Sequence, residues 1–179
     1  ANALEFKNNK NYNAACNIYL RLIETEKSVL SHRLLLADSY INLNKEDQAI
    51  VQLEHVCQEY MLQKDYNKAN DGFYKILELS NGKFIVRELI AENFINLGQP
   101  KEAVAELMQL FDIYNNNNSF EDAENTYQKI IHLDPENIDV MTKMAKTCSI
   151  KGHKNQAAEI WAKASDYYLG LNMTDEAID

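Results

Sequence analysis

The chain has 179 residues, of which 46% are hydrophobic, and a formal net charge of -9, values typical of a globular protein large enough for one sizeable domain. Its 5 glycines and 2 prolines disfavour a turn-rich sandwich or barrel and favour a mostly helical fold. No stretch reaches the roughly 18 consecutive apolar residues of a membrane span, and residues 1–10 lack a signal-peptide core, so we expect a cytoplasmic protein without direct membrane insertion. The 27 acidic against 18 basic residues repel phosphate backbones, so nucleic-acid binding is not expected.

Apolar residues recur at the 3.6-residue helical period in every segment that lies between turn residues. We therefore expect an all-α chain of nine full helices, with partial helices at both ends and no strands. The expected helices span roughly 12–26, 29–43, 46–62, 66–79, 83–97, 100–114, 119–133, 137–151 and 154–169, with ends uncertain by about three residues.

Turn chemistry marks several helix ends. Ser119 is a good N-cap, and Glu121 and Asp122 follow it in the first turn, where acids complement the helix dipole. Four residues that tolerate the left-handed conformation are expected just after helix C-termini: Asn44, Gly98, Asn118 and Gly152.

The chain is also predicted to be a repeat, because alanines recur in matching local contexts. These alanines are Ala15, Ala49, Ala69, Ala103, Ala123, Ala157 and Ala177. Their spacings alternate between 34 and 20 residues, which predicts a period of 54 residues and units of about 15–68, 69–122 and 123–176. Small residues at helix crossings allow close approach, so Ala91, Ala103, Ala145 and Ala157 should be nearly fully buried. The last helix is expected to turn Ala157, Ile160, Trp161, Ala164 and Tyr168 inward.

Two sets of spacings resemble the tetratricopeptide repeat (TPR) family. The first-helix pattern is Met144-Ala145, Cys148, Ala157, Trp161 and Ala164, and the second-helix pattern is Ala123, Tyr127, Ile130 and Pro135. The family's first-helix Trp position is occupied by Arg33, Arg87 and Met141, and its Gly position by Ala37, Ala91 and Ala145. The resemblance covers essentially the whole chain and implies one α-solenoid domain, a right-handed superhelix of antiparallel helices. Because the sequence begins and ends within a repeat, we expect it to be a fragment of a longer array.

No motif predicts catalysis, a metal or a cofactor. Cys16, Cys57 and Cys148 form no CxxC pair and are expected to be reduced core residues. The four histidines lack metal-ligand spacing, and the acid pairs at helix starts are better explained as capping groups than as catalytic acids. The chain is therefore predicted not to be an enzyme.

The resemblance implies a partner-binding groove lined by the first helices of each pair. Its candidate residues are acidic: Asp38, Glu88, Glu92, Asp112 and Asp166. They favour a protein or peptide partner with a basic segment, or else they are simply solvated surface.

Three functional classes stay open. The first is a non-catalytic interaction scaffold or adaptor of TPR type, which would assemble a larger complex. The second is a peptide- or ligand-sensing regulatory repeat domain. The third is a self-associating assembly domain, for which Ile41, Ile95 and Ile150 are the apolar residues to examine.

Overall fold

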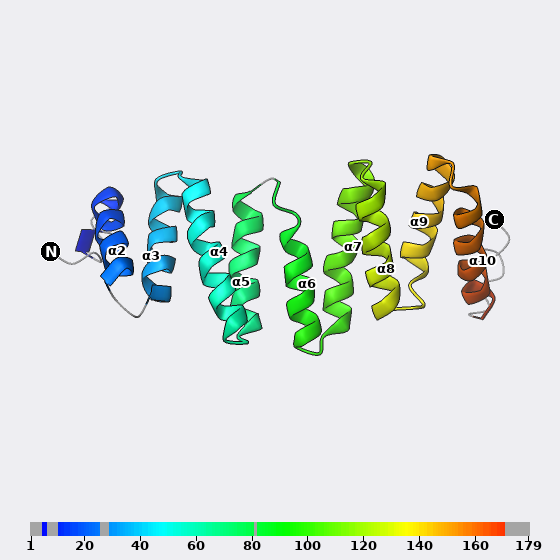
Figure 1. Ribbon diagram of the computed structural model, residues 1–179, viewed down its shortest axis with the longest axis horizontal. Coiled ribbons are helices and arrows are strands. Elements are labelled where there is room, and N and C mark those ends of the chain that lie inside the picture. The colour runs from blue at the N-terminus through cyan, green and yellow to red at the C-terminus, as the bar shows by residue number, and fades with distance from the viewer. Residues whose placement is uncertain (1–4, 7–10, 26–28, 81, 171–179) are drawn as a thin grey trace. The chain divides into compact units, whose positions relative to one another are not determined.

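The fold was analysed in a computed structural model that describes residues 5–6, 11–25, 29–80 and 82–170. Over these residues the chain is all-helical, with nine consecutive helices and no strand (Figure 1). The helices are α2 (Tyr12–Thr25), α3 (Val29–Asn42), α4 (Glu46–Leu62), α5 (Tyr66–Leu79), α6 (Val86–Asn96), α7 (Pro100–Asn116), α8 (Phe120–Leu133), α9 (Ile138–Lys151) and α10 (Lys154–Gly170). The predicted fold class is therefore confirmed.

The chain divides into two compact units, Ala1–Leu97 and Gly98–Asp179. Within each unit, helices that follow one another in sequence pack against one another, which is the arrangement of a TPR-like array. The predicted grouping into three 54-residue repeats within one domain stays a prediction.

The helix bounds agree with the expected ones to within three residues. The largest difference is at α6, which begins at Val86 rather than at residue 83. Lys83 to Ile85 form a tight turn first, in which the Val86 amide donates to the Lys83 carbonyl at 3.0 Å and the Arg87 amide donates to the Phe84 carbonyl at 3.0 Å. These i to i+3 bonds replace the first α-helical bonds.

The predicted left-handed residues are confirmed at the ends of four helices. Their φ angles are 54° at Asn44, 71° at Gly98, 59° at Asn118 and 87° at Gly152. The sequence analysis missed Lys64, which has φ 59° after α4 and lies 54 residues before Asn118.

N-caps were predicted less well. Ser119 occupies the N-cap position of α8, but its side chain makes no capping hydrogen bond, which corrects the expectation. Within the described part of the chain, three residues cap a helix with the side chain: Asn11 accepts from the Ala14 amide, Asp65 from the Lys68 amide and Asn137 from the Val140 amide.

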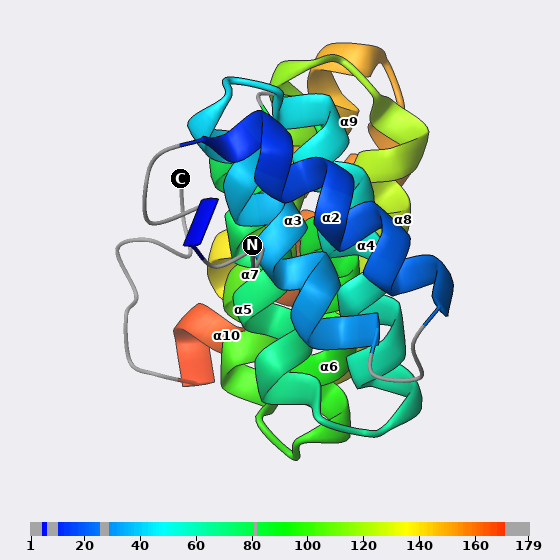
Figure 2. The same cartoon turned by 90° about the vertical axis from the view of Figure 1, so that its left-hand side faces the viewer.

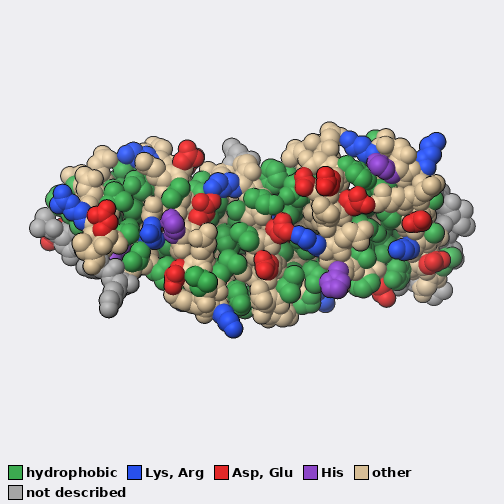
Figure 3. Space-filling view, in the orientation of Figure 1, with side chains coloured by type: hydrophobic (Ala, Val, Ile, Leu, Met, Phe, Trp, Pro, Cys, Tyr) green, Lys and Arg blue, Asp and Glu red, His purple; other side chains and the backbone are tan. Residues whose placement is uncertain are grey.

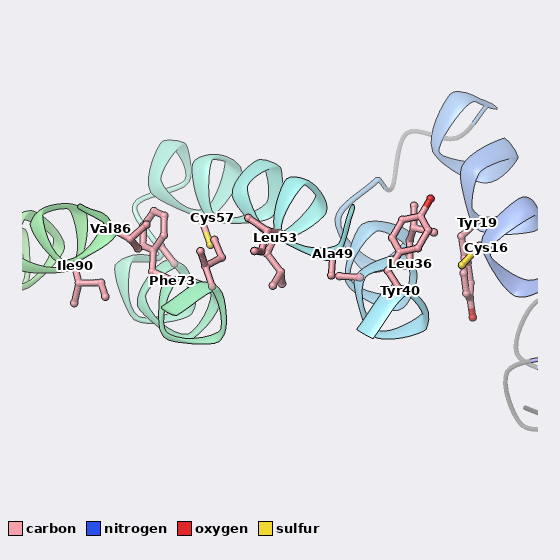
Figure 4. Close-up of a cluster of buried hydrophobic side chains, with 14 of the residues drawn as sticks. Cys16, Tyr19, Leu36, Tyr40, Ala49, Leu53, Cys57, Phe73, Val86 and Ile90 are labelled. Atoms are coloured by element: carbon pink, nitrogen blue, oxygen red, sulfur yellow. The ribbon is translucent and has the colours of Figure 1, made fainter. Parts of the chain in front are cut away.

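In the first unit, α2 packs on α3, α3 on α4, α4 on α5 and α5 on α6 (Figure 2). Their facing sides form one apolar cluster, from which Figure 4 shows Leu53 and Cys57 of α4 and Phe73 of α5. Ala49 of α4 and Ala69 of α5 have no exposed surface, and small residues at buried positions allow neighbouring helices to approach closely.

In the second unit, α7 packs on α8, α8 on α9 and α9 on α10. Ala103, Ala145 and Ala157 are buried here, as Ala91 is in the first unit, so the four alanine predictions are confirmed.

Trp161 was expected to point inward, but 38% of it is exposed. Leu53 of α4 and Leu107 of α7, its counterparts at 54-residue spacing, are buried. The residues that follow α10, 171–179, lie outside the described part of the chain, as does Ala177. α10 buries Ala157, Ile160 and Ala164, while Tyr168 is half-buried.

Candidate functional site

The exposed side of α6 combines apolar and acidic side chains. Its members recur at helical spacing: Ile85, which precedes the helix and is 50% exposed, Glu88, Leu89, which is 37% exposed, and Glu92. The opposite side of α6 carries Val86, Ile90, Ala91 and Asn93, all of which are buried in the first unit. We call residues 85, 88, 89 and 92 the α6 face.

The packing of the first unit fixes the orientation of the α6 face. The Lys83 ammonium, just before α6, forms an ion pair with the Glu54 carboxylate of α4. On the buried side, the Asn93 Nδ2 donates to Asn70 Oδ1 of α5 at 2.7 Å. The Lys83 ammonium, which lies next to the α6 face, is thus already paired with Glu54.

Asp38, the third candidate in the first unit, is exposed on α3. That helix packs against α2 and α4, whereas α6 packs against α5. The structure therefore brings Glu88 and Glu92 together on one helix face and places Asp38 on another helix.

In the second unit, Asp112 of α7 is already an ion-pair partner. Its carboxylate lies 3.2 Å from the Lys143 Nζ of α9, and the same ammonium lies 3.2 Å from the Asp139 carboxylate. Desolvation opposes the charge of Lys143, but hydrogen bonds to Asp139 and Asp112 outweigh it and raise the pKa of this ammonium. A partner cation would have to compete with Lys143 for Asp112.

Asp166, the fifth candidate, lines a cavity of about 260 Å³ in the second unit. The other lining residues are Glu136, Ile138, Tyr167 and Gly170. This cavity, which we call the α10 socket, joins the beginning of α9 to the last turns of α10.

A second cavity of the same unit measures about 450 Å³ and lies where α7 begins and α8 ends. Pro100, Lys101, Val104, Leu133 and Asp134 line it. The Asp134 carboxylate accepts a hydrogen bond of 2.8 Å from Asn137 Nδ2, which fixes its position on the rim.

The residues named for self-association differ in exposure. Ile150 is 83% exposed, Ile95 is exposed, and Ile41 is half-buried. Ile41 and Ile95 are spaced by 54 residues, but the next position in that series is Ser149, so Ile150 is not their repeat equivalent.

Charges of both signs are scattered among hydrophobic side chains on the surface. On the face that Figure 3 shows, acidic and basic side chains lie interspersed among apolar ones in each unit. The acidic groove implied by the resemblance stays a prediction.

The three cysteines are free and buried. Burial raises the pKa of the Cys57 thiol to about 12, and it raises the pKa values of Cys16 and Cys148 as well. Among the described residues, no group of His, Cys, Asp or Glu is arranged to hold a metal ion. Within the same residues, no helix combines the length and the apolar character that crossing a membrane requires.

Glu88 and Glu92 were predicted from the sequence, whereas Ile85 and Leu89 were not. Their spacing of four residues, with Glu88 and Glu92 interleaved, was the available signal. It was missed because isolated leucines and isoleucines in a helical array are first assigned to the core.

A scan against protein-family models gave no match, and a search of curated proteins gave none either. Solved structures that match over most of the chain are TPR proteins. The C-terminal part of a TPR repeat-containing protein from Cytophaga hutchinsonii is 15% identical, with 94% of this chain and 78% of that chain covered and a TM-score of 0.34. YrrB, a TPR protein with an unusual peptide-binding site, is 17% identical, with 90% and 98% covered and a TM-score of 0.34. A signal transduction ATPase from Pyrococcus horikoshii, which has a tetratricopeptide repeat sensor, is 16% identical, with 98% and 30% covered and a TM-score of 0.45.

Proposed function

We propose that this chain is a non-catalytic, TPR-type interaction module that helps to assemble a larger complex by binding a basic, amphipathic segment of a protein partner. The observation that carries the proposal is the α6 face, where exposed Ile85 and Leu89 lie beside Glu88 and Glu92. Exposed apolar side chains with charged neighbours are typical of a docking surface for a partner helix.

The chemistry of the face defines the partner. Ile85 and Leu89 are one helical turn apart and offer a short apolar strip, so the partner needs an apolar anchor such as leucine. Glu88 and Glu92 are also one turn apart and favour lysine or arginine beside that anchor. The excess of acids in the whole chain attracts such a segment at long range and repels nucleic acid. The three free, buried thiols are typical of a reducing compartment, which supports placing this interaction in the cytoplasm.

The test uses a fluorescein-labelled amphipathic peptide of about 14 residues, with leucines on one helical face and lysines on the other. Replacing Glu88 and Glu92 together with Lys should slow its association about tenfold at low salt and much less at high salt. Stopped-flow anisotropy measures this rate. We expect the free energy of unfolding to change by less than about 0.5 kcal/mol at exposed Glu92 and by more at half-buried Glu88, so urea unfolding accompanies the binding assay.

A matched control separates the α6 face from the general charge of the chain. Asp71 and Glu78 are exposed on α5 of the same unit and lie seven residues apart, so replacing both with Lys changes the net charge equally. The control should slow association much less than the Glu88 and Glu92 reversal does. Equal slowing by both pairs would mean that the acids act only through net charge, and the proposed docking face would be wrong.

The apolar strip is tested separately by Leu89→Ser. Losing a partly exposed leucine contact should weaken binding about tenfold, mainly through faster dissociation. Unchanged dissociation would show that the peptide does not dock on this face.

A ligand-sensing role is the second candidate, supported by the cavity of about 450 Å³ at Lys101 and Asp134. Its volume is in the range of about 300 to 1,000 Å³ that is usual for small-molecule sites. Titration with zwitterionic apolar amino acids, monitored by the amide resonances of Lys101 and Val104, tests this alternative. Self-association through Ile95 or Ile150 is tested by the solution mass of Ile95→Ser and Ile150→Ser.

A further inference from the structure

We propose that the packing of α6 on α5 includes one buried water molecule, bound between the side-chain amides of Asn70 and Asn93. The site lies inside the first unit, on the side of α6 opposite the α6 face, so the inference does not depend on the proposed function. It combines three observations: the burial of both amides, the hydrogen-bonding groups that they leave unpartnered, and the way in which the equivalent pairs of residues are satisfied.

The two amides meet in the interior of the first unit. Only 4% of the surface of Asn70 on α5 is exposed, and none of the surface of Asn93 on α6 is. The Asn93 Nδ2 donates to Asn70 Oδ1 at 2.7 Å. Each amide side chain carries one NH2 group and one carbonyl oxygen, so a single hydrogen bond between two amides uses only half of these groups.

The other donor and the other acceptor have no protein partner. Asn70 Nδ2 and Asn93 Oδ1 are buried, and neither forms a hydrogen bond with any of the described residues. Turning both amides over by 180° would exchange the donor and the acceptor of the existing bond and would again leave one NH2 group and one oxygen. The unpartnered groups therefore follow from joining two asparagines through one hydrogen bond, whichever way the amides are turned.

A water molecule has the hydrogen-bonding groups that complete this pair. It can accept a hydrogen bond from Asn70 Nδ2 and at the same time donate one to Asn93 Oδ1, and buried waters in proteins bridge otherwise unsatisfied polar groups in this way. Without such a bridge, both groups would lose their hydration on folding and gain nothing in its place, which destabilises a protein. A metal ion is a poor occupant, because an amide NH2 group donates hydrogen bonds and is not a metal ligand.

The equivalent pair at the crossing of α2 and α3 needs no bridging group. Cys16 and Ser39 lie 54 residues before Asn70 and Asn93 and are buried like them. The Ser39 Oγ donates to the Leu35 carbonyl of its own helix at 2.8 Å, and a thiol such as that of Cys16 is only a weak donor.

Protein groups also satisfy the equivalent pair of the second unit. Glu124 and Thr147 lie 54 residues after Asn70 and Asn93. The Glu124 carboxylate accepts a hydrogen bond from Gln156 Nε2, and the Thr147 Oγ1 donates to Asn115 Oδ1 at 2.7 Å. Of the three pairs, the asparagine pair alone is left with buried side-chain groups that no described residue satisfies.

Nuclear Overhauser effects between solvent water and the side-chain amide protons test the proposal in the unaltered, ¹⁵N-labelled protein. For the NH2 groups of Asn70 and Asn93, we expect cross-peaks to water of opposite sign in the laboratory and rotating frames, which marks a water molecule that tumbles with the protein. Asn96 is the matched control, because it is exposed on the same helix and its Nδ2 donates to the Glu92 carbonyl at 3.0 Å. Its cross-peaks should have the same sign in both frames, as for surface water.

A double variant counts the water. Asn70→Leu combined with Asn93→Leu removes both amides and keeps side chains of similar size, an exchange that proteins often tolerate because no polar group is left alone. Oxygen-17 relaxation dispersion of the solvent measures the number of long-lived waters, and this number should fall by one in the double variant. Asn96→Leu is the control and should leave the number unchanged.

Two results would overturn the assignment. The first is cross-peaks to water that are missing at both asparagines or have the same sign in both frames, since that sign pattern indicates proton exchange or surface water. The second is an equal number of long-lived waters in the unaltered protein and in the folded double variant. If the double variant does not fold, the Overhauser measurement on the unaltered protein still decides.

Discussion

Where α4 and α5 cross, one sulfur atom should determine whether a substitution stabilises or destabilises the protein. Gly72 lies in the middle of α5 and is buried, and a Cβ added there would lie 2.4 Å from Cys57 Sγ of α4. Carbon and sulfur cannot approach so closely, so the Gly72→Ala substitution must displace the thiol. Cys57 itself has no exposed surface, so the thiol can move only within the packed interior.

The expected size of the effect follows from two opposing contributions. Alanine is favoured over glycine by about 1 kcal/mol in a helix interior, which would stabilise the variant. Overpacking a buried contact costs about 1 to 3 kcal/mol, and over most of that range the cost exceeds the gain in helix propensity. We expect Gly72→Ala to destabilise the protein by about 1 kcal/mol.

Removing the sulfur should reverse the sign. After Cys57→Ala, the remaining Cβ of residue 57 would lie 4.0 Å from the new methyl group, which is an ordinary van der Waals contact. Gly72→Ala should then stabilise the protein by about 1 kcal/mol relative to Cys57→Ala alone. The two substitutions should therefore be coupled by about 2 kcal/mol, a value within the range for residues in contact.

The assay is urea unfolding of the four proteins of this double-mutant cycle, followed by far-ultraviolet circular dichroism. Trp161 fluorescence provides a second signal from the other unit, since the chain has 1 tryptophan and it lies on α10. A Gly72→Ala effect of the same sign and size in both backgrounds would refute the steric argument.

Three further predictions concern helix ends, thiols and small core residues. Lys64→Gly should stabilise the protein by about 0.5 to 1 kcal/mol in thermal unfolding, because φ is 59° there, whereas Gly98→Ala, with φ 71°, should destabilise it. Cys57 should resist iodoacetamide at pH 8 in the folded protein and react in urea, as measured by mass spectrometry. Because the folded pKa of this thiol is about 12 against an ordinary 9.0, the unfolded chain loses the proton first, and stability should fall as the pH rises above 9.0. Ala103→Leu and Ala157→Leu should each lower stability by about 1 to 3 kcal/mol through overpacking, and an unchanged melting temperature in both would contradict the packing argument.

The sequence predicted the helices well because helix formation leaves local signals. Apolar residues at 3.6-residue spacing and turn residues such as Gly98 and Gly152 are visible without any knowledge of tertiary contacts. The buried alanines were predictable for a related reason, since a small residue that recurs at a fixed spacing marks a helix crossing.

The candidate site was less predictable because its properties depend on residues far apart in the sequence. Asp112 was identified as a groove acid, but its pairing with Lys143 of another helix requires the fold. Trp161 was assigned to the core from its spacing to Leu53 and Leu107, but 38% of it is exposed, because spacing alone does not determine what packs over a side chain. A repeat pattern predicts where a residue lies on its own helix, whereas neighbouring helices determine its exposure and charge partners.

One position of the repeat pattern shows how such neighbours determine the function of a surface. Leu35, Leu89 and Lys143 are spaced by 54 residues, as are Gln58, Asp112 and Asp166. In the second unit, lysine at the first of these positions neutralises Asp112. In the first unit, Leu89 occupies that position and Gln58 the position of Asp112, so the same ion pair cannot form there. Equal spacing along the chain therefore does not by itself predict an ion pair, because both positions must also carry charged residues, as Lys143 and Asp112 do in the second unit.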